Sequence, residues 1–121
     1  MSVLISLKCE IDVADADKLR TAIKHLHKAR VIKSIESQYG DHYLLTLPNA
    51  QYFVRVSLEK GKIIVKGYEE DMQAIQRLQT ALTDMYLAIE TLNVLQMQNF
   101  TITNFSFQAD GSIILEADSY G

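Results

Sequence analysis

The first segment of the chain alternates between apolar and polar side chains from residue 3 to residue 11. The apolar positions are Val3, Ile5, Leu7, Cys9 and Ile11. Because successive side chains of a β-strand point to opposite faces, this period predicts a strand with one buried face. Cys9 falls on the inward face, so we interpret it as a small buried hydrophobic residue rather than a reactive thiol.

A helical period follows this strand. The apolar positions Leu19, Ala22, Ile23 and Leu26 recur at helical spacing. They predict an amphipathic helix that runs to about Lys28. Acidic residues between Asp12 and Asp17 precede the apolar positions, where carboxylates meet the positive end of the helix dipole. We therefore expect the helix to begin in this acidic stretch.

Four strand-like segments come next. They read VIKSIESQY, HYLLTL, QYFVRVSLE and IIVKG, with turn-forming residues between them. In the third segment the alternating apolar positions are Tyr52, Val54, Val56 and Leu58. Turn residues between alternating segments indicate hairpins. We expect an antiparallel meander of four strands.

The longest apolar stripe begins after Gly67. It consists of Met72, Ile75, Leu78, Leu82, Met85, Ile89 and Leu92. Steps of three and four residues predict one long helix with a continuous buried face. Leu87 and Val94 lie off this stripe, which hints at a further contact of the helix.

The chain closes with two alternating segments, FTITNFSFQ and SIILEAD, on either side of Asp110-Gly111. Asp-Gly is a strong hairpin signal, because such turns require positive φ values. The first of the two segments loses its alternation between Ile102 and Phe105. This predicts a β-bulge near Thr103 or Asn104.

Three acidic residues near this turn raise the question of a cation site. They are Asp110, Glu116 and Asp118. A calcium loop needs further oxygen ligands, but the residues that follow the glycine are mostly aliphatic, Ile113 and Leu115 among them. We therefore expect a turn between two strands and no metal.

Together these segments predict an α+β fold with the element order β-α-β-β-β-β-α-β-β. It contains a mostly antiparallel twisted sheet and two helices. The chain has 121 residues and no linker-like stretch, which is close to the usual size of one domain. We expect residues 1–121 to form a single α+β domain.

The composition of the chain indicates its cellular location more than its function. The net charge is −3 and 48% of the residues are hydrophobic, as in ordinary soluble domains. The N-terminal segment lacks the basic start of a signal peptide, and no apolar run approaches the roughly 20 residues of a membrane span. With one cysteine no internal disulfide can form. We expect a cytoplasmic protein that does not bind membranes.

Known catalytic motifs are missing. The sequence has no nucleophile elbow, phosphate-binding glycine loop or zinc-protease motif. His25 and His27 diverge on a helix and cannot hold one ion together, and His42 stands beside a turn. We expect no cofactor and no catalytic residue. An enzyme with its site in a crevice between sheet and helix stays an alternative.

The most unusual charge pattern is a basic block. Lys18, Arg20, Lys24, Lys28, Arg30 and Lys33 occur without an intervening acid. On a helical wheel Arg20, Lys24, His27 and Lys28 lie opposite the apolar stripe. One interpretation is a solvated helix face with cations near its C-terminal end. The other is a surface that binds anions, nucleic acid or an acidic partner, although aromatic residues to stack on bases are missing there.

A second apolar set falls on the strand face that the helices would leave open. Its members are Leu4, Leu44, Phe53, Ile64 and Ile114. Five large apolar side chains are too many for a wholly hydrated surface if they cluster. A second copy of the chain is the simplest cover and would form a two-fold symmetric dimer. A helix on each face, or a strand shifted by a bulge, would also explain the pattern.

Both ends of the chain resemble a family of small proteins from cyanobacteria and chloroplast genomes, which began as a hypothetical reading frame. The matching segments are DADKLRTAIKHL after the first strand, Tyr86 with AIETL in the late helix, and NFTITNFSFQADGSIILEA at the end. This chain has Asn99 where the family usually has glycine, and it ends DSYG without the family's tryptophan or arginine. Residues 31–66 show no match. The resemblance implies a similar α+β layout and no catalytic residue.

The leading functional hypothesis is therefore a non-catalytic protein-binding or assembly module that acts as a homodimer. Anion or nucleic-acid binding through the basic helix face is the first alternative. A small enzyme is the second. The sequence does not identify a protein partner.

Overall fold

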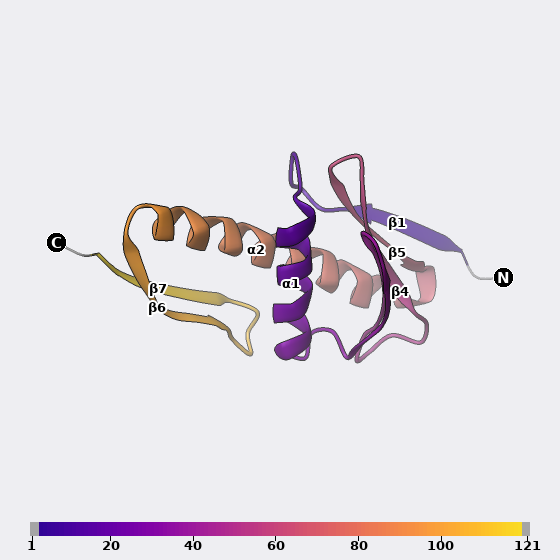
Figure 1. Cartoon of the computed structure of the whole chain (residues 1–121). Coiled ribbons are helices and arrows are strands. Elements are labelled where there is room, and N and C mark those ends of the chain that lie inside the picture. Colours follow the sequence, from indigo (N-terminus) through magenta and orange to yellow (C-terminus); the bar gives the residue numbers. More distant parts are fainter. Residues whose placement is uncertain (1–2, 120–121) are drawn as a thin grey trace.

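The computed structural model describes residues 3–119 (Figure 1). The elements are β1 (Leu4–Lys8), α1 (Ala16–Lys28), β2 (Ser34–Tyr39), β3 (His42–Thr46), β4 (Val54–Glu59), β5 (Lys62–Tyr68), the 3₁₀ turn η1 (Glu69–Asp71), α2 (Met72–Met97), β6 (Phe100–Phe107) and β7 (Ile113–Ser119). This confirms the α+β class and the predicted order of strands and helices.

Five strands form the main sheet, in the order β1-β5-β4-β3-β2. Every neighbouring pair is antiparallel. The four-stranded meander is therefore confirmed, and the first strand adds to it beside β5.

The last two strands form a sheet of their own. The sequence patterns were interpreted as one sheet, and that interpretation was wrong for β6 and β7. The reason lies in α2, whose 26 residues carry the chain about 39 Å at a rise of about 1.5 Å per residue. The closing hairpin thus starts at the far end of this helix, away from the main sheet (Figure 1).

The hairpin has the predicted turn and the predicted bulge. Gly111 has a φ of 91°, a conformation that glycine adopts at little cost. The Gln108 backbone N–H donates to the Ser112 carbonyl at 2.8 Å and closes the loop. The register of β6 against β7 shifts between Ile102 and Asn104. The bulge thus lies where the alternation of the sequence breaks.

Both helices cover the same face of the main sheet (Figure 1). The core forms between this face and the helices. Its strand residues include Tyr43, Leu45, Val54, Val56, Ile63 and Val65, and its helix residues include Leu19, Ala22, Ile23, Leu26, Ile75, Leu78, Leu82, Met85 and Tyr86. Cys9 is also buried, as its position on the first apolar face indicated. In the described part of the chain, no helix lies over the opposite face of the sheet (Figure 1).

Helix α1 begins as the acidic stretch predicted. Asp15 is the N-cap, and its side chain accepts hydrogen bonds from the backbone N–H groups of Asp17 and Lys18. The backbone N–H of Asp15 itself donates to the Tyr86 hydroxyl at 2.7 Å. Because Tyr86 is buried on α2, this bond fixes the start of one helix against the middle of the other.

The first turns of α2 pack very closely on β5. A Cβ atom built on Gly67 would lie 2.5 Å from Cδ1 and 3.2 Å from Cγ1 of Ile75. Real Cβ atoms do not approach so near, so the absence of a side chain at residue 67 sets the spacing between helix and sheet.

Helix α2 extends beyond the main core and carries the β6–β7 hairpin on its distal half (Figure 1). No residue of this arm, from Glu90 to Ser119, is fully buried. Its apolar side chains, such as Leu92, Phe105 and Leu115, are half-buried. The arm is thus a two-layer extension without a closed core.

Asn99 follows the end of α2 with a φ of 67°. Glycine and asparagine are the residues that adopt this conformation most readily after a helix. The asparagine therefore meets the same backbone requirement as a glycine would.

Within the described part of the chain, no helix combines the length and the apolar character of a membrane-spanning segment.

Candidate functional site

The uncovered face of the main sheet contains an apolar hollow of about 480 Å³. Its apolar lining consists of Leu4, Leu44, Tyr52, Phe53 and Tyr68. Leu4 is 68% exposed and Phe53 is 53% exposed, so the chain itself leaves these side chains in water. Three residues of the apolar set expected from the sequence, Leu4, Leu44 and Phe53, thus come together.

Strand register explains this gathering. Leu4 on β1 lies opposite Tyr68 on β5, and Leu44 on β3 lies opposite Arg55 on β4. Facing residues of neighbouring antiparallel strands share one side of the sheet. Residues distant in sequence therefore line one end of the uncovered face.

The aromatic residues of the hollow are held in place. The rings of Tyr52 and Tyr68 lie with their centroids 4.9 Å apart at an angle of 59°. The loop before β4 is fixed by the buried carboxylate of Asp71, which accepts hydrogen bonds from the backbone N–H groups of Gln51 and Tyr52 at 2.8 and 3.0 Å. The start of α2 thereby positions the aromatic loop on the opposite side of the sheet.

Two cations border the hollow. Arg55 lies directly opposite Lys66 in the register of β4 and β5, and both line the hollow. Lys66 forms an ion pair with Glu59 at 3.1 Å. Among residues 3–119 no ion pair of Arg55 is found. The hollow therefore combines aromatic rings with one unpaired guanidinium.

Two residues of the expected apolar set lie elsewhere. Ile64 is on the same sheet face, since it lies opposite Lys8 on β1, but it is half-buried and outside the hollow. Ile114 is on β7 and belongs to the separate two-stranded sheet. Its assignment to the main sheet was wrong because alternation shows which face a residue occupies but not which sheet its strand joins.

The sequence did not identify four residues of this surface, which are Tyr52, Tyr68, Arg55 and Lys66. Tyr52 continued the inward alternation of Val54 and Val56, but the strand begins only at Val54, and Tyr52 is exposed in the loop before it. The turn signal Pro48-Asn49 could have indicated a loop long enough to include residue 52.

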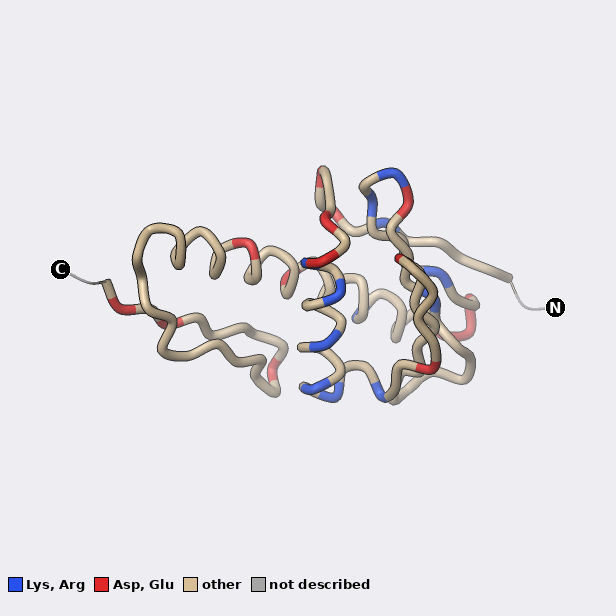
Figure 2. Tube along the Cα trace, in the orientation of Figure 1, with Lys and Arg blue, Asp and Glu red and all other residues tan. Residues whose placement is uncertain are grey.

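The four residues of the expected basic face, Arg20, Lys24, His27 and Lys28, are all exposed on α1. Figure 2 shows lysine and arginine positions along this helix and around its C-terminal end. Arg20 is paired, because its guanidinium donates to Asp17 at 2.7 Å. His27 and Lys28 instead line a cavity of about 600 Å³. The structure thus divides the basic face into a paired part and a part that borders a cavity.

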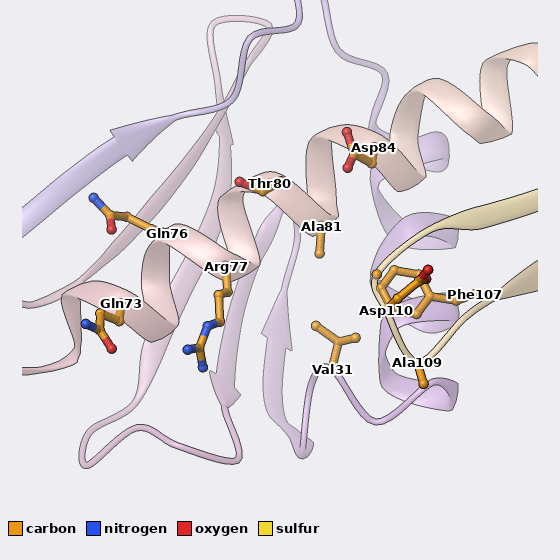
Figure 3. A pocket seen from close by; sticks show the side chains of 11 residues that line it. Val31, Gln73, Gln76, Arg77, Thr80, Ala81, Asp84, Phe107, Ala109 and Asp110 are labelled. Carbon is orange, nitrogen blue, oxygen red and sulfur yellow. The ribbon is translucent and has the colours of Figure 1, made fainter.

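A cavity of about 630 Å³ lies between α2 and the tip of the β6–β7 hairpin (Figure 3). Arg77 and Asp84 line it, but they extend to different sides of α2, while Val31, Ala81 and Phe107 face the gap. The carboxylate of Asp110 accepts two hydrogen bonds from Ser112, from its hydroxyl and its backbone N–H, and these lower the pKa of Asp110. This acid caps its own turn, so the cavity has no converging catalytic groups.

The crevice between helix and sheet is smaller. A cavity of about 180 Å³ lies between α2 and the loop after β3. Arg77 is the one ionisable side chain in its lining. General acid–base catalysis mostly uses a histidine or a carboxylate placed next to the reacting group, and the lining of this crevice contains neither.

Two histidines, His25 and His42, lie outside the cavities described above. His25 packs edge-on against Phe105 with ring centroids 5.1 Å apart. Burial, and the nearby charge of Lys28, lower the pKa of His25, which favours its neutral form at this contact. His42 is exposed at the first position of β3.

The acidic residues of the closing hairpin do not converge. Glu116 accepts a hydrogen bond from the Asn104 side chain at 3.0 Å, while Asp110 bonds to Ser112. Throughout residues 3–119 no three histidine, cysteine or acidic side chains gather as metal ligands would.

No protein-family model, curated protein or solved structure matches this chain.

Proposed function

We propose that this protein is a non-catalytic assembly module whose working form is a homodimer, joined through the uncovered face of the main sheet. One observation carries the proposal. Leu4, Leu44 and Phe53 gather with two tyrosines in an exposed hollow, and no helix within residues 3–119 covers this face.

The residue types in the hollow support a protein partner. Tyrosine, phenylalanine and arginine are enriched at the buried centres of protein interfaces, where they supply most of the binding energy. Tyr52 and Phe53 from the loop before β4, and Arg55 from β4, all line the hollow. The Lys66–Glu59 ion pair provides a polar edge. The hollow thus has an apolar centre and a charged border.

A second copy of the chain is the partner that we propose. A two-fold axis brings the same patch of each subunit against the other, so one hollow covers its equivalent and the assembly closes as a dimer. The aromatic loop is held by Asp71 before any partner binds, which reduces the ordering cost of association.

The cellular setting of the proposal is the cytoplasm. The thiol of Cys9 is buried and free, as suits a reducing compartment. Membership in the cyanobacterial and chloroplast family likewise stays a proposal, supported by the turn and strand motifs at the chain's ends.

Light scattering after size exclusion, over a wide range of protein concentration, tests the dimer. We expect the native chain to have twice the mass of one chain. Phe53→Asp and Leu4→Asp each place a charge in the interface, so we expect both variants to be monomeric. Their circular dichroism spectra should not change, because both side chains are largely exposed in the single subunit.

Met97→Asp is the matched control, since Met97 is 84% exposed on the distal end of α2. This variant should remain a dimer. A native chain that is monomeric at every concentration would contradict the proposal. A dimer that dissociates on Met97→Asp but not on Phe53→Asp would place the interface on the arm and would overturn the assignment to the sheet.

A further inference from the structure

All the ionisable side chains that line the cavity at the C-terminal end of α1 are basic. Its residues are His27, Lys28, Arg30, Ile32, Lys33 and Pro48. Two of these basic side chains come from the last turn of the helix, and the other two come from the loop that leads to β2. The cavity holds no acidic side chain in its lining.

These cations have no acidic partners within residues 3–119. The ion pairs found there involve Lys18, Arg20 and Lys66. The chain has 15 acidic and 12 basic residues, so acids are plentiful elsewhere. Like charges around one hollow repel one another unless an anion lies between them. Only the partial negative charge at the C-terminal end of α1 offsets these cations, and no carboxylate within residues 3–119 pairs with them.

The backbone at Arg30 supplies an independent observation. Its N–H donates to the His27 carbonyl at 3.1 Å, and the next N–H, of Val31, donates to the Leu26 carbonyl at 2.9 Å. This pair of bonds is the Schellman motif that ends many helices, and glycine is usual at the position of Arg30. Arg30 has a φ of 64°, a conformation that side chains with a Cβ atom disfavour.

An arginine thus occupies a backbone position suited to glycine, and its side chain lines the cavity. Strained positions that persist in a fold are concentrated at functional sites. The guanidinium can donate two parallel hydrogen bonds to phosphate oxygens, while a lysine acts as a point charge. Lys28 and Lys33 stand on the same cavity, so three permanent cations are available to one ligand.

We propose that this cavity binds a small phosphate-bearing ligand with at least two negative charges, such as an organic diphosphate. Its volume of about 600 Å³ lies within the range of about 300–1,000 Å³ for small-molecule sites. Pro48, which is exposed beside Ile32, provides apolar surface for the organic part. The lining contains no phenylalanine, tyrosine or tryptophan on which successive bases could stack, so a small phosphate fits it better than a nucleic-acid strand.

This site revises the basic face expected from the sequence. Arg20 is paired with Asp17, and Lys24 does not line the cavity. Arg30 and Lys33 take their place beside His27 and Lys28. The cavity shares no residue with the hollow on the sheet, so the two proposals stand or fall separately.

Isothermal titration with inorganic pyrophosphate and with ADP tests the site. We expect saturable binding that weakens as salt is added. Arg30→Gly should weaken the binding of both ligands about tenfold or more, since it removes charge-assisted hydrogen bonds. Arg30→Lys keeps the charge and should restore part of the affinity. A thermal melt of Arg30→Gly should show an intact fold, because glycine suits the backbone there.

Lys8→Ala is the matched control, since Lys8 is exposed on β1 outside the cavity. It removes one positive charge and should leave both affinities unchanged. Equal weakening by Lys8→Ala and Arg30→Gly would show diffuse attraction and overturn the site. The proposal is also overturned by the absence of saturable binding, or by binding of single-stranded DNA without binding of pyrophosphate or ADP.

Discussion

Asp71, at the start of α2, accepts a hydrogen bond from the backbone N–H of Tyr52 at 3.0 Å. The other carboxylate oxygen accepts one from Gln51 at 2.8 Å. The carboxylate is buried, and the loop that it holds carries Tyr52 and Phe53 onto the uncovered sheet face. A polar contact inside the molecule thus determines the shape of an exposed surface.

Removing this carboxylate should destabilise the fold and disturb the hollow together. In Asp71→Ala two backbone N–H groups lose their acceptor, and we expect the free energy of unfolding to fall by about 2–4 kcal/mol, at about 1–3 kcal/mol for each unsatisfied group with partial access to water. Urea denaturation measures this change. Asp84→Ala, on the exposed side of the same helix, should change stability by less than about 0.5 kcal/mol. Equal effects of both variants would show that the hydrogen bonds of Asp71 contribute nothing.

The close approach of Gly67 and Ile75 makes a specific prediction of non-additivity. Gly67→Ala places a methyl group against Ile75, and overpacking of this kind costs about 1–3 kcal/mol. Ile75→Val removes the nearest methyl group and costs about 0.5–1.5 kcal/mol alone. The double variant should be more stable than the sum of the two changes indicates. Chemical denaturation of all four proteins gives the coupling energy, and simple additivity would contradict the tight contact.

Arg30 should be replaceable with a gain in stability. Glycine adopts the φ of 64° without the strain of about 1–2 kcal/mol that a side chain incurs there, although it loses about 0.5–1 kcal/mol in chain entropy. We expect Arg30→Gly to raise the free energy of unfolding by about 0.5–1 kcal/mol. Denaturant melts measure the difference. A lower stability would mean that the arginine side chain contributes packing to the fold.

Because the thiol of Cys9 is buried, we expect the free energy of unfolding to fall at alkaline pH. Burial raises the pKa of Cys9 above its ordinary value of 9.0. The unfolded chain therefore loses this proton first, so the contribution of Cys9 to stability is complete below about pH 8 and declines as the pH rises through the unfolded and then the folded pKa. Cys9→Ala should reduce the slope of stability against pH above about pH 8.5.

A thiol reagent provides the second measurement on Cys9. The native protein should react slowly, because Cys9 is 1% exposed and only the thiolate is nucleophilic. Denaturant should make the reaction fast. Rapid labelling of the native protein would show that the segment after β1, which carries Cys9, opens readily.

Local periodicity was enough to predict the helices, the meander, the hairpin and its bulge. These features depend on neighbours in sequence, such as the stripe of Leu19 and Leu26 or the turn at Gly111. The pairing of β6 and β7 in a separate sheet was not predictable in this way. This separate pairing follows from the length and direction of α2. Ile114 was assigned to the main sheet for the same reason, because its alternation does not show which sheet β7 joins.

The candidate surfaces were predictable only in part. Alternation identified Leu4, Leu44 and Phe53, because each falls out of phase with the buried positions. The contribution of Tyr68 depends on its register with Leu4, which a single segment does not reveal. The positive charges of Arg30 and Lys33 are evident from the sequence. Their cavity, however, depends on the left-handed backbone conformation of Arg30, and without a glycine at this position the sequence does not indicate that α1 ends there.

The arm beyond Ile89 has a consequence for how the molecule comes apart. Its strands and its half of α2 bury no side chain completely, whereas the main sheet and the first half of α2 enclose the core. Segments with few buried contacts open at lower free energy than the whole fold. Local unfolding should therefore begin at β6 and β7 and extend along α2 toward Tyr86, while the sheet that carries the hollow stays folded.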